Sequence, residues 1–194
     1  MSETYFIADT HFGHKNILSY DNRPFNTTEE QDQAIIDRWN EKVGLLDDIW
    51  ILGDVSWYSV TKTIEILNSL NGDKKLCIGN HDSKLIKNKD FRNCFTEIVE
   101  YKEFNYGDKN IILSHYPIPC FKNHYYGWCH LYGHVHNSFE WNMMEKTRRE
   151  MIELYNMPCK MYNVGCMLPY MDFTPQTLFE IETKYEKWKN IKFE

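Results

Sequence analysis

Residues that could bind a metal ion recur at five places along the chain, and each place directly follows a short apolar run. The first is ADTHFGH, residues 8–14, in which Asp9, His11 and His14 follow the apolar residues 5–7. The other blocks read LGD, IGNHD, LSH and YGHVH, and they contain Asp54; Asn80, His81 and Asp82; His115; and His134 and His136. Carboxylate, imidazole and amide ligands without thiolate favour Mn, Fe, Zn, Ni or Co over a cysteine-rich structural zinc site.

The number of candidate ligands predicts a pair of ions. Seven ligands drawn from these residues would be too many for one ion, but they would suit two ions that share a carboxylate. Catalytic metal pairs lie roughly 3.5–4 Å apart, where two dications repel each other unless an anion lies between them. Asp54, which stands alone after its apolar run, is the best candidate for that bridge.

The apolar runs that precede the blocks predict strands, and a helical pattern separates the early ones. The predicted strands that end at the blocks are residues 4–8, 48–52, 76–78, 110–114 and 129–132. Thr27 and Glu30 fit a capping box that begins a helix running to about Val43, and residues 61–70 form a second predicted helix. Residues 161–164 and 178–182 are predicted as closing strands.

This order of elements predicts an α/β fold with a ligand site at one edge. Strand and helix alternate in the early half, whereas the later strands lack intervening helices and are predicted to form a second sheet against the first. In layered α/β folds, ligands bind outside the carboxyl ends of the strands. A single polar residue at one strand end is more often a cap or a turn residue, but five consecutive strand ends of this kind favour a shared site.

Length and composition predict one globular domain over residues 1–194. Of its 194 residues, 42% are hydrophobic, which is typical of globular proteins. No apolar run approaches the roughly 20 residues of a membrane helix, and no signal peptide is recognised, so a cytoplasmic protein is predicted. The net charge of −6 and the lack of a Lys/Arg run argue against an extended nucleic-acid track. The six scattered cysteines are expected to be reduced core residues.

The ordered set D-x-H, G-D, G-N-H-D, H and G-H-x-H resembles that of the calcineurin-like (binuclear) metallophosphoesterases. The resemblance spans Asp9 to His136. It implies two packed mixed β-sheets flanked by helices, a four-layer α/β/β/α sandwich. It also implies that one ion is held by Asp9, His11 and His136, the other by Asn80, His115 and His134, with Asp54 bridging and His81 facing the substrate. After His136 the resemblance weakens, and only residues 163–165 look like the late strand of the family.

Such a site would hydrolyse a phosphate ester. Two dications less two carboxylates leave a formal charge of +2, which favours an anionic substrate. The ions, Mn above the others, would lower the pKa of a bridging water so that hydroxide attacks phosphorus, and His81 would protonate the leaving oxygen as general acid. Asp82 is expected to orient a neighbouring imidazole or to cap the next helix.

The predicted substrate is a small phosphodiester, such as a cyclic nucleotide or a similar metabolite. A phosphomonoesterase is the alternative. A nuclease is less favoured because the basic track is missing, and an inactive metal-bound scaffold is less favoured because every motif residue is present. The oligomeric state is left open.

Several residues outside the motif keep two interpretations. His14 is a phosphate contact or a loop histidine, and Arg23 is a bidentate phosphate clamp or a surface arginine. The aromatic segment 121–128 is expected to overhang the metals, where it would stack a base or pack on the core. Residues 140–156 are predicted to be helical and to form a lid, a dimer surface or a core-packing helix, the last being favoured. His124 and His130 are predicted to be structural.

Overall fold

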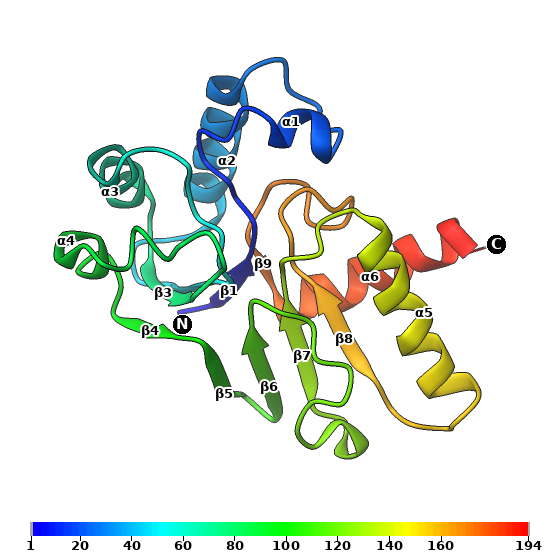
Figure 1. The fold of residues 1–194 in the computed structure, drawn as a ribbon. Helices are drawn as coiled ribbons and strands as arrows, with labels where there is room; N and C mark the ends of the chain where they lie inside the picture. The colour runs from blue at the N-terminus through cyan, green and yellow to red at the C-terminus, as the bar shows by residue number, and fades with distance from the viewer. Residues whose placement is uncertain (1, 194) are drawn as a thin grey trace.

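Two mixed β-sheets pack face to face at the centre of the structure (Figure 1). The computed structural model describes residues 2–193, with side chains described for residues 2–189. The first sheet has the order β4 (Glu97–Val99), β3 (Asp73–Cys77), β2 (Asp48–Ile51), β1 (Thr4–Ile7) and β9 (Gln176–Thr177). Only β9 runs antiparallel to its neighbour there. The second sheet has the order β5 (Tyr101–Tyr106), β6 (Lys109–Ser114), β7 (Cys129–Tyr132) and β8 (Lys160–Asn163), with β5 antiparallel to β6.

Large aromatic side chains join the two sheets. Phe6 and Trp50 are register partners on β1 and β2, and their ring centroids lie 6.5 and 6.2 Å from that of Phe104 on β5. Alternate residues such as Ile49 and Ile51 point to the opposite face of the sheet and are also fully buried. Because both faces of the first sheet are covered, its central strands read as continuous apolar runs.

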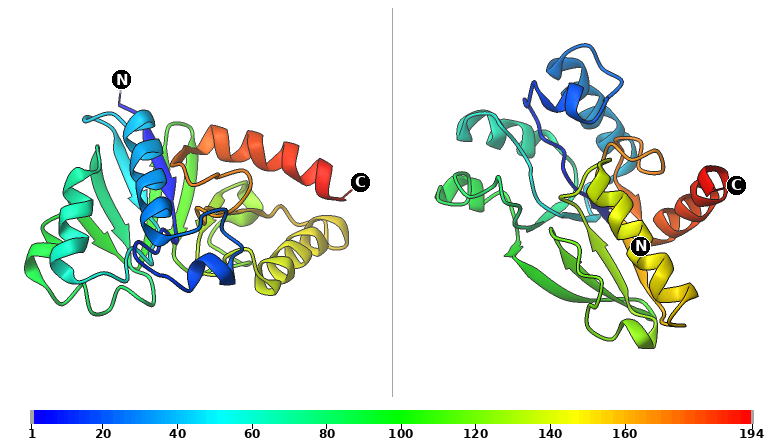
Figure 2. Two further views of the ribbon diagram at one scale, coloured as in Figure 1. Left: turned by 90° about the horizontal axis from the view of Figure 1, so that it is seen from above. Right: turned by 45° about the vertical axis from the view of Figure 1, so that its right-hand side comes forward.

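Helices cover the outer sides of the sheets. Helices α2 (Thr28–Lys42) and α3 (Val60–Ser69) lie on one side of the molecule, and α5 (Phe139–Glu153) and α6 (Leu178–Phe193) lie side by side on the other (Figure 2). Trp141 of α5 stacks on Trp188 of α6 with the ring centroids 4.9 Å apart. The short helices are α1 (Ile17–Tyr20), α4 (Lys89–Arg92) and the 3-10 helix η1 (His124–Tyr126). The predicted fold class is confirmed.

The predicted beginning of α2 is confirmed in part. Thr27 is the N-cap, and its hydroxyl accepts a hydrogen bond from the Glu30 N–H at 3.1 Å. The Glu30 carboxylate accepts from the N–H of Asn26 rather than from that of Thr27, so the box is not reciprocal.

Residues 178–182, predicted as a strand, are the first turns of α6, and the strand prediction is wrong. Leu178, Ile181 and Tyr185 are buried together at helical spacing, whereas Phe179 is 72% exposed. Thr177 and Glu180 form a reciprocal capping box, in which the Glu180 carboxylate accepts from the Thr177 N–H at 2.9 Å.

The aromatic segment 121–128 does not overhang the predicted metal ligands, so that expectation is wrong. Strands β6 and β7 are parallel, and their connection must therefore return to the amino end of β7. The His124 ring lies there, with Nδ1 3.0 Å from the carbonyl of Pro158, which precedes β8. His124 is buried, as its structural interpretation predicts.

Helix α5 packs one face into the core, as predicted for a core-packing helix. The buried residues of that face are Trp141, Glu145, Arg148 and Met151. A role of segment 140–156 as a lid or dimer surface stays a prediction. Within residues 2–193, no helix is both long and apolar enough to cross a membrane. All six cysteines are free, and four of them are buried.

Candidate metal centre

The loop after β1 connects the carboxyl ends of both sheets. The N–H of Asp9 donates to the carbonyl of Gly53, which follows β2, at 3.1 Å. One residue earlier, the N–H of Ala8 donates to Val164 O at 2.8 Å, and its carbonyl accepts from the Cys166 N–H at 2.9 Å. Val164 and Cys166 follow β8 of the second sheet, so these bonds bring the strand ends of the two sheets to one place.

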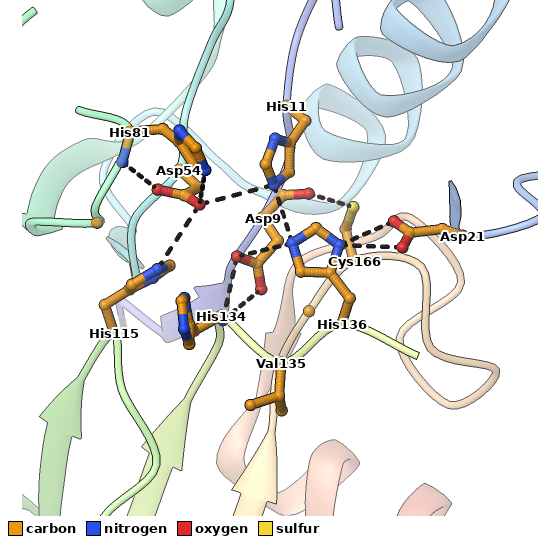
Figure 3. A network of polar contacts seen from close by, with 12 residues as sticks. Asp9, His11, Asp21, Asp54, His81, His115, His134, Val135, His136 and Cys166 are labelled. Atoms are coloured by element: carbon orange, nitrogen blue, oxygen red, sulfur yellow. Dashed lines mark hydrogen bonds and ion pairs between the residues drawn. The ribbon is translucent and has the colours of Figure 1, made fainter. Parts of the chain in front are cut away.

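The first group of predicted ligands is assembled there (Figure 3). One ligand atom each from Asp9, His11, Asp54 and His136 lies within 4.8 Å of the others, a geometry that could hold a metal ion. The Nε2 atoms of His11 and His136 are 3.1 Å apart, and Nε2 of His136 lies 3.8 Å from Oδ1 of Asp9.

The second group lies beside the first and shares Asp54 with it. The Asn80 side-chain oxygen lies 2.9 Å from Nε2 of His115 and 2.9 Å from Nδ1 of His134. Oδ2 of Asp54 is 3.7 Å from Nε2 of His115 and 3.8 Å from Nε2 of His11. A single carboxylate oxygen therefore lies between the two groups, in the position expected of a bridging ligand.

The orientation of the imidazoles fits a cation. Nδ1 of His115 lies 2.7 Å from the carbonyl of Leu52 and donates its proton to it, so in the neutral imidazole, the form that binds a metal, Nε2 presents a lone pair. That lone pair faces the side-chain oxygen of Asn80, a second acceptor, at 2.9 Å. Two acceptors that face each other without a proton between them repel, and a bound cation would remove this repulsion. The donor set of the site thus suits a metal ion.

The protonation of the ligands differs from residue to residue. Burial lowers the pKa of His11 well below its usual value and also lowers that of His134, so both imidazoles are neutral near pH 7, as metal ligands must be. At His136, burial acts in the same direction but the negative charges of Asp9 and Asp21 outweigh it, and the pKa is raised. Burial also raises the pKa of Asp9.

The backbone at the site is strained. Five of the predicted ligands have φ in the left-handed region, namely Asp9 (55°), His11 (50°), Asp54 (56°), His134 (71°) and His136 (47°). This conformation costs roughly 1–2 kcal/mol for an L-residue, although Asp and His adopt it more readily than most. The concentration of strain at the converging strand ends is typical of functional sites.

Backbone N–H groups hold the two carboxylates in place. Both oxygens of Asp9 accept from the N–H of His134, at 3.0 and 3.2 Å. Oδ1 of Asp54 accepts from the N–H of His81 at 2.9 Å, which leaves Oδ2 directed at the imidazoles.

Asp82 neither orients an imidazole nor caps a helix, so both expectations for it are wrong. Its fully buried carboxylate accepts three backbone hydrogen bonds, from Gly79 at 2.8 Å and from Asp54 and Val55 at 3.0 Å each. Burial raises the pKa of Asp82 to about 6, even though these bonds favour the charged form. Asp82 therefore joins the loop that carries Asn80 to the loop that carries Asp54.

Arg23 is not a surface arginine, and its contacts leave no donor for a phosphate. The side chain is fully buried, and four of its five N–H groups donate hydrogen bonds to protein acceptors. Nη1 donates to Gln31 and to the carbonyl of Thr10, Nη2 donates to the carbonyl of Asp9, and Nε donates to Asp21, whose Oδ2 also forms an ion pair with Nη2 at 2.9 Å. The guanidinium thus holds the backbone of the loop that carries Asp9 and Thr10. The interpretation of Arg23 as a phosphate clamp is not supported.

Trp57, which the sequence analysis did not single out, contacts three histidines of the site. The His14 ring stacks flat on the indole, with centroids 4.1 Å apart and 4° between the planes. The rings of His81 and His11 lie 4.4 and 4.6 Å from it. Burial lowers the pKa of His14, whose Nδ1 is buried without a hydrogen-bond partner. Contact of His14 with a phosphate stays a prediction.

Two pockets open beside the second group of ligands. One, of about 230 Å³, is lined by Ser56, Trp57, Tyr58, Asn80, His81, Ser83, Lys84 and Leu85. The other, of about 300 Å³, is lined by Tyr116, Pro117, His134, Val135, Glu140, Met143 and Met144. Asn80 lines the first pocket and His134 lines the second, and these two side chains contact each other, so both pockets border the second group of ligands.

Comparison with known proteins identifies relatives. No protein-family model matches the chain. The chain is 36% identical over 138 residues to the uncharacterized protein MJ1445 of Methanocaldococcus jannaschii, and the aligned residues cover 70% of each chain. It is 32% identical over 134 residues to the Gene 66 protein of Mycobacterium phage L5, covering 60% of this chain and 64% of the phage protein. Among solved structures, a protein of unknown function from Aquifex aeolicus, AQ665, aligns with a TM-score of 0.71 and 26% identity, covering 94% of this chain and 99% of that one.

The sequence motif, the fold and the geometry of the site are consistent with one another. The five blocks occur in the family order, they follow strands of two packed mixed sheets, and their side chains converge around Asp54. The chain shares its family with the Methanocaldococcus jannaschii protein. Its sequence motif, fold and candidate metal centre resemble those of the calcineurin-like metallophosphoesterases.

Proposed function

We propose that the protein is a metal-dependent phosphoesterase that hydrolyses a small phosphodiester, such as a cyclic nucleotide or a similar metabolite. The observation that carries this proposal is the convergence of seven oxygen and nitrogen ligands on two groups that share one oxygen of Asp54. Asp9, His11 and His136 would hold one divalent ion, Asn80, His115 and His134 the other, and Asp54 both. Ions bound there would place positive charge beside the phosphate and would lower the pKa of a bound water molecule.

The charge of the site suits an anionic ester, although the whole chain is acidic. Two dications and the carboxylates of Asp9 and Asp54 sum to +2, whereas the net charge of the chain is −6. At contact distance the local charge dominates, because bound cations are the largest charges in such a site.

His81 is suited to protonate the leaving oxygen. Its side chain is 49% exposed, so a substrate can reach it, and its Nε2 lies 4.0 Å from Oδ2 of Asp54. The imidazole thus borders both the metal ligands and the solvent, where a general acid must be to reach the departing group.

The two pockets favour a diester over a monoester. An acyclic phosphodiester carries two separate substituents, and the pocket beside His81 and the pocket beside His134 each offer room for one, whereas a cyclic nucleotide would place its single nucleoside in one of them. A monoester has only one substituent and would use one pocket. Hydrolysis of a monoester remains the alternative that the experiment must distinguish.

The test is a panel of esters assayed with the metal-loaded protein. We expect two Mn ions per chain by elemental analysis, and faster turnover of bis(p-nitrophenyl) phosphate and cyclic nucleotides than of p-nitrophenyl phosphate. Asp54→Ala should weaken the binding of both ions, whereas Asp37→Ala, a change on the exposed face of α2, should leave metal content unchanged. One tight ion that survives Asp54→Ala would refute the shared carboxylate, and faster monoester turnover would select the alternative.

The same panel tests the class of metal. His11, His115, His134 and His136 supply four imidazoles, which suit transition metals better than a hard, strongly hydrated ion. We expect lower turnover with Mg than with Mn or Ni. Equal turnover with Mg would argue against an imidazole-rich catalytic site.

A further inference from the structure

Trp57 contacts His81, the candidate general acid, and lines a pocket together with it. The indole ring lies 4.4 Å from the tilted His81 ring, and the His14 ring stacks flat on it at 4.1 Å. Trp57 nevertheless keeps 38% of its surface exposed, and it lines the pocket of about 230 Å³ together with His81. A ligand in this pocket would therefore contact both rings.

We propose that this pocket binds the leaving group of the substrate, and that Trp57 selects leaving groups that carry a flat heteroaromatic ring, as a nucleoside does. The proposal rests on the proposed function, in which His81 protonates the leaving oxygen. Whatever is bonded to that oxygen must lie next to His81, and the pocket is the space that opens there.

The walls of the pocket fit one ring system with polar edges. Trp57 and Leu85 are apolar, and an indole is a good surface for stacking a base. Ser83 and Lys84 are exposed at the same pocket and offer hydroxyl and ammonium donors to acceptors on the ring edge. The volume is below the roughly 300–1,000 Å³ of sites for drug-sized ligands, so the pocket suits a single ring system.

The reaction assigns each product to a side of the site. Water adds to phosphorus, the bond from phosphorus to the leaving oxygen breaks, and that oxygen takes the proton of His81. For adenosine 5′-(methyl phosphate), the products should be adenosine and methyl phosphate, because the ring of the substrate occupies the pocket beside His81. Methanol and adenosine monophosphate would form if the ring occupied the other pocket.

The experiment compares that substrate with ribose 5′-(methyl phosphate), which has the same leaving oxygen and no base. We expect the unaltered protein to prefer the adenosine ester in kcat/KM, and Trp57→Ala to reduce this preference on the order of tenfold, the scale of base stacking on an aromatic side chain. Trp57→Phe should keep most of the preference. Tyr126→Ala, which removes a ring that is 84% exposed and lies outside the pocket, should leave it unchanged.

A purely structural role for Trp57 makes a different forecast. If the indole only holds His14 and His81 in place, Trp57→Ala slows both esters equally and the preference stays the same, which overturns the proposal. Release of methanol and adenosine monophosphate overturns it as well.

Binding separates this proposal from the proposed function. Saturation-transfer NMR with the Zn-loaded protein should detect adenosine but not ribose, and the adenosine signal should weaken in Trp57→Ala. If no ester is hydrolysed, the proposed function fails, but this binding result would still support the pocket. Equal binding of adenosine by both proteins would overturn the pocket even in an active enzyme.

Discussion

Both carboxylate oxygens of Asp21 lie 3.0 Å from Nδ1 of His136. The imidazole therefore donates its Nδ1 proton to Asp21 and directs Nε2 at the other metal ligands. Burial works against the charged form of Asp21, but the hydrogen bond and charge of His136 and the neighbouring Arg23 outweigh it, and the pKa of Asp21 is lowered. A charged residue on the loop after α1 thus sets the tautomer of a ligand on the loop after β7.

We expect Asp21→Asn to weaken one metal ion by 10- to 100-fold, the usual effect of removing a carboxylate that orients a ligand histidine. The amide oxygen can still accept a hydrogen bond from Nδ1 of His136, but it lacks the charge that makes the imidazole more basic. Competition with a chelator measures the affinity of each ion, and Asp37→Asn serves as the exposed control. Equal affinities in Asp21→Asn and the unaltered protein would show that Asp21 does not support the site.

Gly79→Ala should disrupt the site through a direct clash. A Cβ atom at position 79 would lie 2.3 Å from Oδ1 and 2.4 Å from the backbone nitrogen of Asp54. Because the backbone there is buried, we expect a loss of roughly 2 kcal/mol or more in the free energy of unfolding, at the upper end for overpacking, together with weaker binding of both ions. Urea unfolding and elemental analysis measure these effects. Gly44→Ala, whose new Cβ meets only the Asp47 side chain, at 3.2 Å, is the control and should be tolerated.

His81→Ala should damage turnover according to the leaving group. A general acid matters most for a strongly basic alkoxide and little for an acidic nitrophenolate. We expect a loss on the order of 10²–10⁴ in rate on alkyl or nucleoside esters and a much smaller loss on nitrophenyl esters. Both ions should remain, because no ligand atom is removed.

A structural histidine at position 81 would behave differently. It would cost stability or metal content and reduce the rate on both ester types equally. Rates on the two types, measured with metal content on the same sample, decide between the roles. An equal loss at full metal occupancy would exclude His81 as the acid.

His130 should make folding stability fall in mild acid. Its Nδ1 lies 3.1 Å from the carbonyl of Ile112, and its Nε2 accepts from the N–H of Ile118 at 3.1 Å. Burial lowers the pKa of His130 to about 4 in the folded protein, against the ordinary 6.5. The unfolded chain therefore gains its proton first as the pH falls, so the stabilisation is complete above pH 6.5 and is lost between pH 6.5 and 4.

Between pH 7 and pH 5, this group alone should lower the free energy of unfolding by about 2 kcal/mol. Urea unfolding at several pH values measures the slope. His130→Gln should be less stable at pH 7 but should show a flatter pH dependence. An unchanged slope in the variant would assign the acid sensitivity to other groups.

Some features of the fold were readable from sequence because their signals are local. Thr27 caps the beginning of α2 by a hydrogen bond to a residue only three positions later. The apolar runs before Asp9, Asp54 and His115 are long enough to define strands. At α6 a local signal was also present, since Thr177 and Glu180 form a capping box. The short apolar segment that follows it is compatible with a strand or a helix, and only the packing shows that the residues at helical spacing are the buried ones.

The sequence by itself determined which residues form the candidate metal centre. Parallel strands place their carboxyl ends at one edge, so ligand types that recur after successive strands must converge, whatever the detailed geometry. The tertiary structure decided how those residues are held. Asp21 orients His136, Asp82 joins two ligand loops, and the buried Arg23 holds the loop after β1. These contacts join loops that come together only in the folded chain. Such contacts leave no periodic or capping pattern in the sequence, because they depend on where the folded loops meet rather than on the neighbours of each residue.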